Sequence, residues 1–189
     1  MISEKNISGK DLFFTDEKRF ILNPPLNRQT NQIRLDKKGY NEYISEKGEL
    51  YEKIAKPIPK FPVGIMVASG ISVNGPGRLV FVTGTINSFS YKQTLEIFKE
   101  DIERLGQNLY FQQDNAPCHV AKKSLEYIRS NFKKVLDFWH PNSPDLSPIE
   151  ELWSIVEQRL SNYSFNNTDE MARELKWIWN PIPKSICKN

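Results

Sequence analysis

Three acidic residues stand where their side chains could share a metal ion. Asp16 lies in FFTDEKRF, Asp114 ends an apolar run in LYFQQDNAPCH, and Glu150 opens a helical pattern in NSPDLSPIEELW. Carboxylate oxygens are the ligands that hard cations such as Mg²⁺ and Mn²⁺ prefer. Side chains alternate along a strand, so Asp16 falls on the face of Leu12 and Phe14, where a lone carboxylate is costly unless a cation compensates its charge.

Each of these residues also has a structural interpretation. An aspartate beside a turn is ordinary, which applies to Asp16, and Asp114 could start an Asx turn. Glu150 fits a capping box, with Ser147 as the N-cap and Pro148 at the first helical position. Taken one at a time, the three positions do not separate a catalytic role from a structural one.

The hydrophobic patterns predict the elements that must position these residues. Strands are expected at Asp11–Thr15, Arg19–Leu22, Val63–Ser72, Arg78–Thr83, Leu109–Gln113 and Val135–Trp139, the first two forming a β-hairpin that turns near Glu17 and Lys18. Helices are expected at Tyr91–Leu105, Ala121–Phe132, Ser147–Leu160 and Thr168–Trp179. This order predicts an α/β fold, a mixed sheet flanked by helices.

The domain organisation follows from length and composition. The 189 residues suit a single domain, and residues 23–62, rich in Pro, Asn, Gln and Lys, are predicted to form an irregular insertion with one short strand near Ile33–Leu35. A hydrophobic fraction of 39% indicates a folded protein. The net charge of +3 is compatible with a nucleic-acid partner but does not identify one.

Other features narrow the cellular setting. Cys118 and Cys187 give neither a disulfide framework nor a zinc spacing, which favours a reducing compartment. The charged N-terminal segment does not have the pattern of a signal peptide, and no apolar run approaches a membrane span. The chain is therefore expected inside the cell, with no membrane partner.

In combination, the motifs resemble a known family. The segment QQDNAPCHVAKKSLEYIRSNFKKVLDFWHPNSPDLSPIEELWSIVEQRL is similar to the second half of the catalytic domain of mariner-superfamily transposases, above all in QDNAPxH and SPDLxPIExLW. FTDEKRF resembles the family's first catalytic strand, and GIMVASGIS with Tyr91–Leu95 resembles its middle. The resemblance runs from about Asp11 to Pro183. Residues 115–149, 35 in all, separate Asp114 from Glu150, close to the spacing that such transposases keep.

The resemblance implies a fold and a chemistry. These transposases are DDE enzymes with a ribonuclease H-like fold, so residues 1–189 are expected to be one DDE catalytic domain. Asp16, Asp114 and Glu150 would be the catalytic residues and would hold two Mg²⁺ or Mn²⁺ ions. The expected activity is that of a DNA endonuclease and strand transferase of cut-and-paste transposition. The expected partners are transposon ends and target DNA, bound by a homodimer, in the nucleus.

The chain also departs from the family. Only fifteen residues precede Asp16, too few for the paired helix-turn-helix domains that family members place before the catalytic core. The sequence also ends soon after WNPIP, where another helix is expected. We therefore expect a C-terminally truncated chain, either a fragment or a decayed or shortened copy. A second hypothesis is a catalytically silent or domesticated module that binds DNA or protein. A third is another ribonuclease H-like nuclease, such as a resolvase, against which SPDLSPIEELW argues.

Several other residues could contribute to function. His119 could lie near the metal site, contact the DNA backbone or cap the following helix, and the sequence leaves these roles open. Trp153 falls at helical spacing with apolar neighbours, which predicts core packing. Cys118 lacks an activating base, and His140 is expected at the surface. Glu17 and Glu151 each adjoin a proposed ligand and could be mistaken for it. The cations Arg28, Arg34, Lys37 and Lys38 of the predicted insertion are candidates for DNA contact.

Overall fold

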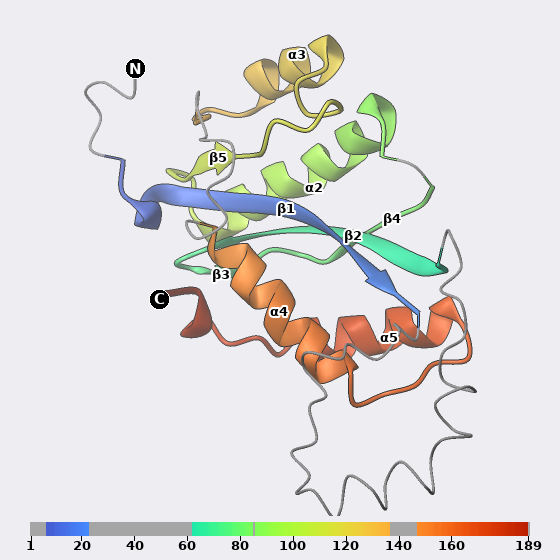
Figure 1. Cartoon of the computed structure of the whole chain (residues 1–189). Helices are drawn as coiled ribbons and strands as arrows, with labels where there is room; N and C mark the ends of the chain where they lie inside the picture. Colours follow the sequence, from blue (N-terminus) through green and yellow to red (C-terminus); the bar gives the residue numbers. More distant parts are fainter. Residues whose placement is uncertain (1–6, 23–61, 85, 137–146, 189) are drawn as a thin grey trace, which may run out of the picture.

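A computed structural model of the chain describes residues 7–22, 62–84, 86–136 and 147–188 (Figure 1). Its elements are η1 (Gly9–Asp11), β1 (Leu12–Ile21), β2 (Gly64–Ser72), β3 (Gly75–Pro76), β4 (Val80–Val82), α2 (Ser88–Leu105), β5 (Tyr110–Gln112), α3 (Lys122–Asn131), α4 (Pro148–Leu160), α5 (Thr168–Trp179) and η3 (Ile186–Lys188). The predicted α/β class is confirmed: in Figure 1, α2 and α3 lie on one side of the sheet, and α4 and α5 lie on the other.

The long strand β1 occupies the centre of a mixed sheet. It pairs antiparallel with β2 from Phe14 opposite Ile71 to Ile21 opposite Gly64. On its other edge it pairs parallel with β5, where Phe14 lies opposite Gln112. The strand order is β3-β2-β1-β5, and β4 also pairs with β2. The parallel pairing covers only the first residues of β1, so the carboxyl-terminal end of β5 lies beside Phe14, two residues before Asp16.

The predicted hairpin at Glu17 and Lys18 is wrong. β1 runs through both residues without a break, with Glu17 opposite Ala68 and Lys18 opposite Val67. The physical reason is that a two-residue hairpin needs residues that readily take positive φ, such as Asn-Gly or Asp-Gly, and Glu-Lys does not supply them. Asp16 therefore lies inside a strand and does not close one.

Two other predictions concern segments that the structure describes only in part. The strand expected at Val135–Trp139 appears in the described residues as a single parallel bridge between Val135 and Phe111, and residues 137–139 lie outside them. The predicted insertion, with its strand at Ile33–Leu35 and its cations, lies outside the described residues apart from Pro62. His140 also lies outside them. These assignments stay predictions.

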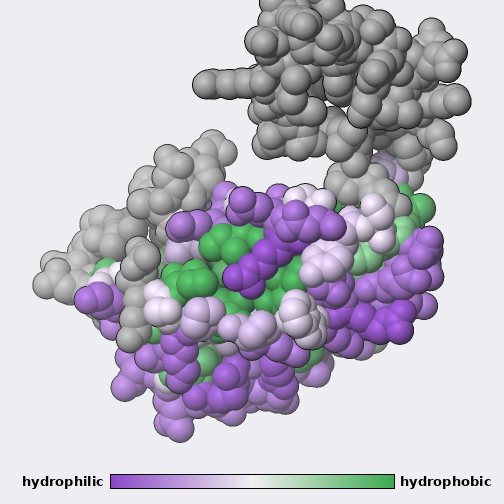
Figure 2. Space-filling view, turned by 90° about the horizontal axis from the view of Figure 1, so that it is seen from below, coloured by the Kyte–Doolittle hydropathy of each residue, from purple (hydrophilic) through white to green (hydrophobic). Residues whose placement is uncertain are grey.

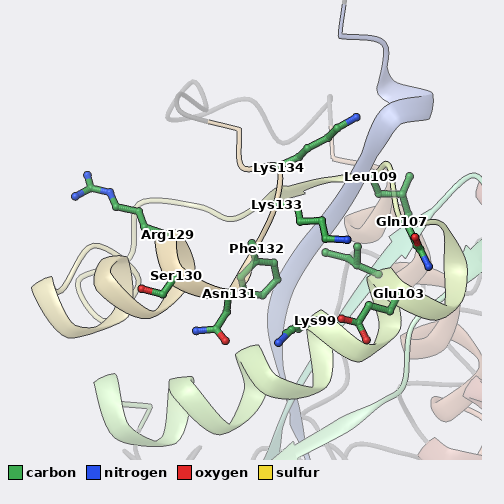
Figure 3. Close-up of a pocket in the computed structure, with 11 residues that line it drawn as sticks. Lys99, Glu103, Gln107, Leu109, Arg129, Ser130, Asn131, Phe132, Lys133 and Lys134 are labelled. Atoms are coloured by element: carbon green, nitrogen blue, oxygen red, sulfur yellow. The ribbon is translucent and has the colours of Figure 1, made fainter.

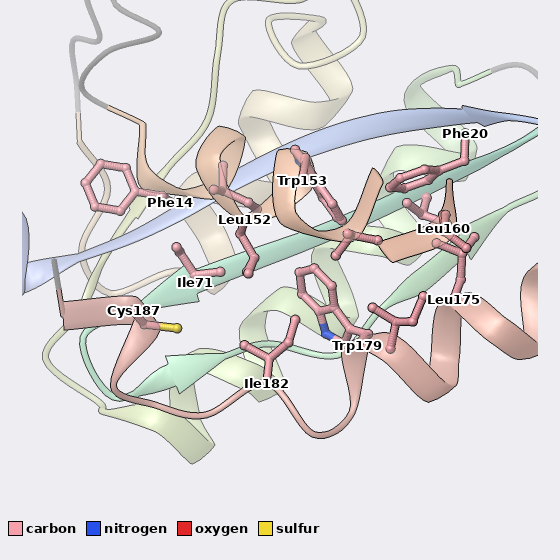
Figure 4. Close-up of a cluster of buried hydrophobic side chains, with 14 of the residues drawn as sticks. Phe14, Phe20, Ile71, Leu152, Trp153, Leu160, Leu175, Trp179, Ile182 and Cys187 are labelled. Atoms are coloured by element: carbon pink, nitrogen blue, oxygen red, sulfur yellow. The ribbon is translucent and has the colours of Figure 1, made fainter. Parts of the chain in front are cut away.

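Alternation along β1 supplies side chains to both faces of the sheet. Phe14 and Phe20 pack on the side of α4 and α5, where Trp153 and Trp179 fill the centre of the core (Figure 4). The ring of Trp153 lies 5.9 Å from that of Phe20 and 5.0 Å from that of Trp179, which confirms its predicted core position. Phe13 points to the opposite face and joins the core under α2 and α3.

Helix α2 is fixed at its start and along its buried face. Asn87 caps it, accepting hydrogen bonds from two backbone N–H groups of the first turn, and the helix starts three residues earlier than predicted. Asp101 is fully buried and accepts hydrogen bonds from the backbone N–H and the Nε of Arg78 at 2.7 and 2.9 Å. Arg104 adds a third contact to this carboxylate. The ion pairs tie α2 to the connection between β3 and β4.

The side of the molecule that carries α4 and α5 is mixed in polarity. Figure 2 shows apolar side chains in the middle of this side, ringed by hydrophilic ones. A salt bridge joins Lys18 of β1 to Glu157 of α4 at 3.1 Å. Among the described helices, none combines the length and the apolar character needed to cross a membrane.

Candidate active site

Asp16 faces the packed side of the sheet, as its position in the strand predicts. The indole N–H of Trp153 donates to Asp16 Oδ2 at 3.0 Å. The pKa of this carboxyl is raised from 3.8 to about 6, chiefly by burial and also by the negative charges of Glu17 and Asp114, which together outweigh the hydrogen bonds that lower it. Asp16 is thus an acid held where its own charge is poorly compensated.

The sheet register brings Asp114 beside Asp16. Phe14 and Gln112 form the last pair between the parallel strands β1 and β5, and each aspartate follows its strand's residue of that pair by two positions. Asp114 Oδ1 accepts the N–H of Ala116 at 2.9 Å, so the Asx turn expected from the sequence is present. The same oxygen lies 2.5 Å from Nδ1 of His119, and this hydrogen bond lowers the pKa of Asp114.

His119 is buried between two carboxylates. Only 2% of it is exposed, and its Nε2 lies 3.3 Å from Glu17 Oε1, within ion-pair distance but not aligned as a hydrogen bond. Burial lowers the pKa of His119, but Asp114 and Glu17 together outweigh it and raise the pKa to about 10. The imidazole is therefore held as a cation between the two acids.

Tyr91 of α2 completes the surroundings of this histidine. Its ring stacks on the imidazole with the ring centres 4.1 Å apart. Its hydroxyl donates to Gln113 Oε1 at 2.6 Å, and the amide of Gln113 donates to the carbonyl of His119 at 3.3 Å. Helix α3 begins at Lys122 after the N-cap Ala121 and has no side-chain cap, so the capping role considered for His119 is wrong. The histidine belongs to the surroundings of Asp114.

Glu150 lies exposed on the first turn of α4. The side chain of Ser147 makes no capping hydrogen bond, so the predicted capping box is not formed. Trp153 follows Glu150 by three residues, on the same side of the helix, and contacts Asp16. The structure thus brings Asp16 and Asp114 together and puts Glu150 on the helix that holds Asp16. Within the described ranges, it gathers no group of three His, Cys, Asp or Glu residues that could hold a metal ion.

A separate hollow of about 580 Å³ lies between the C-terminal parts of α2 and α3 (Figure 3). Four cations line it together with one carboxylate: Lys99, Arg129, Lys133, Lys134 and Glu103. It adjoins the beginning of β5, whereas Asp114 follows the end of that strand. With a single carboxylate, this hollow does not provide the ligands that Mg²⁺ or Mn²⁺ requires.

The sequence did not assign functional positions to Tyr91 and Gln113, and it noted Glu17 only as a possible confusion with Asp16. One available signal was strand alternation, which points Glu17 to the face opposite Asp16 and toward α2. For Tyr91 and Gln113 no sequence signal was available, because their contacts depend on how α2 packs over the loop after β5.

Comparison with known proteins decides the family. A protein-family model described as DDE superfamily endonuclease matches residues 11–172. The chain belongs to this family. The chain is also 32% identical over 126 residues to the Tcb1 transposase of Caenorhabditis briggsae, and 30% identical over 124 residues to the Tc1 transposase of Caenorhabditis elegans. These matches cover 66% and 65% of this chain but 46% and 45% of the relatives, so the DDE domain spans about half of their length.

Solved structures confirm the fold of this DDE domain. The Mos1 mariner paired-end complex with Mn matches with a TM-score of 0.72 at 17% identity, covering 96% of this chain and 51% of that one. The Mos1 transposase catalytic domain with Raltegravir and Mg matches with a TM-score of 0.65 at 16% identity, covering 96% of this chain and 76% of that one. The predicted ribonuclease H-like fold and the resemblance to mariner transposases are thus confirmed.

Proposed function

We propose that this DDE domain is the catalytic part of a cut-and-paste transposase, a metal-dependent DNA endonuclease and strand transferase acting in DNA recombination and integration. The observation that carries the proposal is the side-by-side arrangement of Asp16, inside β1, and Asp114, just after the end of the adjacent parallel strand β5. Helix α4, which bears Glu150, is joined to Asp16 through Trp153. The transposase relatives support the same activity.

The residues present suit a divalent metal. Asp16, Asp114 and Glu150 offer only carboxylate oxygens, the donors preferred by Mg²⁺ and Mn²⁺. Burial makes the charge of Asp16 costly, and a cation beside it would remove that cost. We propose that these three residues hold two such ions, which supply Lewis acidity at the scissile phosphate and acidify an attacking water. The similar Mos1 structures include complexes with Mg and with Mn.

The protein's own side chains then have distinct tasks. Trp153 orients Asp16 by its indole N–H, and the backbone N–H of Ala116 orients Asp114. We propose that transposon ends and target DNA are the partners, bound by a homodimer in the nucleus. Mos1 structures similar to this chain are paired-end complexes, one of them with a left transposon end, which supports a DNA partner.

Nicking of supercoiled plasmid DNA by the full chain tests the proposal. With Mn²⁺ or Mg²⁺ the chain should convert supercoiled DNA to open circles, and EDTA should stop the reaction. Asp114→Asn and Glu150→Gln should each lower the rate by at least about 100-fold, as expected for groups that act on the transition state. Glu151→Gln, at the exposed neighbour of Glu150, is the matched control and should keep the rate. DNA binding without any nicking would instead support the silent-module hypothesis.

A further inference from the structure

Glu17, His119 and Asp114 form a continuous line of contacts beside the proposed catalytic site. His119 lies 2.5 Å from one oxygen of Asp114 and 3.3 Å from Glu17, and it is almost completely buried. Asp16 and Glu17 are successive residues of β1, so their side chains leave the strand on opposite faces. The line therefore approaches Asp114 from the side of α2, whereas Trp153 holds Asp16 from the side of α4.

Asp114 needs such support more than Asp16 does. Its side chain is 56% exposed and follows the end of β5, and besides His119 only the backbone N–H of Ala116 is described as a hydrogen-bond partner of its carboxylate. The buried imidazole holds Oδ1 and leaves the second carboxylate oxygen for another ligand. Stacking on Tyr91 fixes the imidazole itself, and the bond from the amide of Gln113 to the backbone carbonyl of His119 holds the main chain that carries it. Residues around a metal site commonly orient a carboxylate ligand in this way, with a rigid hydrogen-bond donor to one oxygen while the other oxygen faces the metal.

We propose that Glu17 and His119 are a positioning pair that fixes Asp114 for metal binding, and that Glu17 is not itself a ligand. This inference rests on the proposed function, because it assumes that Asp114 binds the metal. Neither residue is required to touch DNA or the reacting atoms. Loss of a group that orients a metal ligand typically weakens metal affinity by about 10- to 100-fold, and this is the size of effect expected here.

Mn²⁺ binding to the full chain, measured by electron paramagnetic resonance without DNA, tests the pair. His119→Asn places an amide N–H near the position of Nδ1 and can still donate to Asp114, whereas His119→Gln places its amide near Nε2. We expect His119→Gln to lose about 10- to 100-fold in affinity and His119→Asn to lose clearly less. If His119 served only to fill space, the larger glutamine would preserve binding better than asparagine, and the proposal would be overturned.

The role of Glu17 is separated by a double-mutant cycle. Glu17→Gln keeps the shape of the side chain, and it should cost about tenfold in Mn²⁺ affinity in the wild-type background. In the His119→Gln background the same change should cost nothing more, because the link to Asp114 is already broken. An equal loss in both backgrounds would mean that Glu17 binds the metal directly, and would overturn the proposal.

Two further measurements keep the result interpretable. Asp114→Asn should abolish Mn²⁺ binding. If Asp114→Asn still binds Mn²⁺, the proposed metal site is wrong. If instead the Glu17 and His119 variants bind Mn²⁺ normally while Asp114→Asn does not, only the positioning pair is refuted. If a His119 variant does not fold in circular dichroism, ¹⁵N-histidine spectra of Glu17→Gln replace it. The chain has two histidines, so the signal of His119 can be separated from that of His140. That signal should shift in Glu17→Gln and on adding Mg²⁺, and an unchanged signal would overturn the proposal.

Discussion

Replacing Asp16 with asparagine should stabilise the metal-free protein at neutral pH. The carboxylate is half-buried and its pKa is raised from 3.8 to about 6, first by burial and then by the charges of Glu17 and Asp114. Asparagine has the same shape and retains an oxygen that can accept the N–H of Trp153. The substitution thus removes the charge and leaves the packing intact.

The magnitude follows from linkage between protonation and folding. A carboxyl whose pKa is higher in the folded state holds its proton more tightly there, so its favourable contribution is complete below 3.8 and is lost as the pH rises through about 6. A rise from 3.8 to about 6 corresponds to about 3 kcal/mol. Solvent screening at this partly exposed position reduces the expected gain of Asp16→Asn to about 1–3 kcal/mol at pH 7.5.

Urea unfolding in EDTA at pH 7.5 and at pH 4 measures this effect. Asp16→Asn should be more stable than wild type at pH 7.5, and the difference should shrink strongly at pH 4, where most of the Asp16 carboxyls of the folded wild type are protonated. Glu151→Gln, at an exposed position, should change stability by less than about 0.5 kcal/mol at either pH. Destabilisation at pH 7.5, or an equal gain at both pH values, would refute the claim that an uncompensated charge is held at Asp16.

Three further outcomes are expected. In thermal unfolding, Mg²⁺ or Mn²⁺ at 100 times its dissociation constant should stabilise the wild type by about 2.7 kcal/mol. The same metal should stabilise Asp114→Asn clearly less, and an equal gain in stability in both proteins would place the metal elsewhere. Trp153→Phe should cost about 1–3 kcal/mol in urea unfolding, because it deletes the donor to Asp16, and a neutral result would mean that this bond contributes nothing. Asp101→Ala should lower the free energy of unfolding by about 3–5 kcal/mol, because it removes the buried carboxylate to which Arg78 and Arg104 are paired. Glu100→Ala, at an exposed ion pair with Arg78, should lower it by less than about 1 kcal/mol. Similar losses in the two variants would contradict the claim that burial makes the Asp101 pair the stronger one.

Much of the fold could be predicted because its elements carry local signals. The helices α4 and α5 combine apolar periodicity with clear ends, and Pro148 at the start of α4 and Asn167 at the cap of α5 mark two of them. The extent of β1 could not be predicted, because a charged Asp-Glu-Lys stretch looks like a turn unless its partners are known. Pairing with β2 keeps those residues extended.

For the candidate site, the sequence pointed to Asp16 and Asp114 but not to the residues that surround them. Asp16 and Asp114 stood out by their positions and by resemblance to a family, and the register of β1 and β5 then placed them side by side. The bond between Trp153 and Asp16 joins residues 137 positions apart, and no local pattern encodes it. The burial of His119 likewise depends on how α2 packs over the loop, a tertiary effect.

The central claim is that Asp16, Asp114 and Glu150 hold the divalent metal. Anomalous X-ray diffraction from crystals of the chain soaked in Mn²⁺ tests it most directly, because the signal locates manganese without assumptions about ligands. The account predicts anomalous peaks within coordination distance of all three carboxylates, with Glu17 turned away toward His119. Manganese bound by Glu17 or Glu151, or found only at sites remote from Asp16 and Asp114, would contradict it.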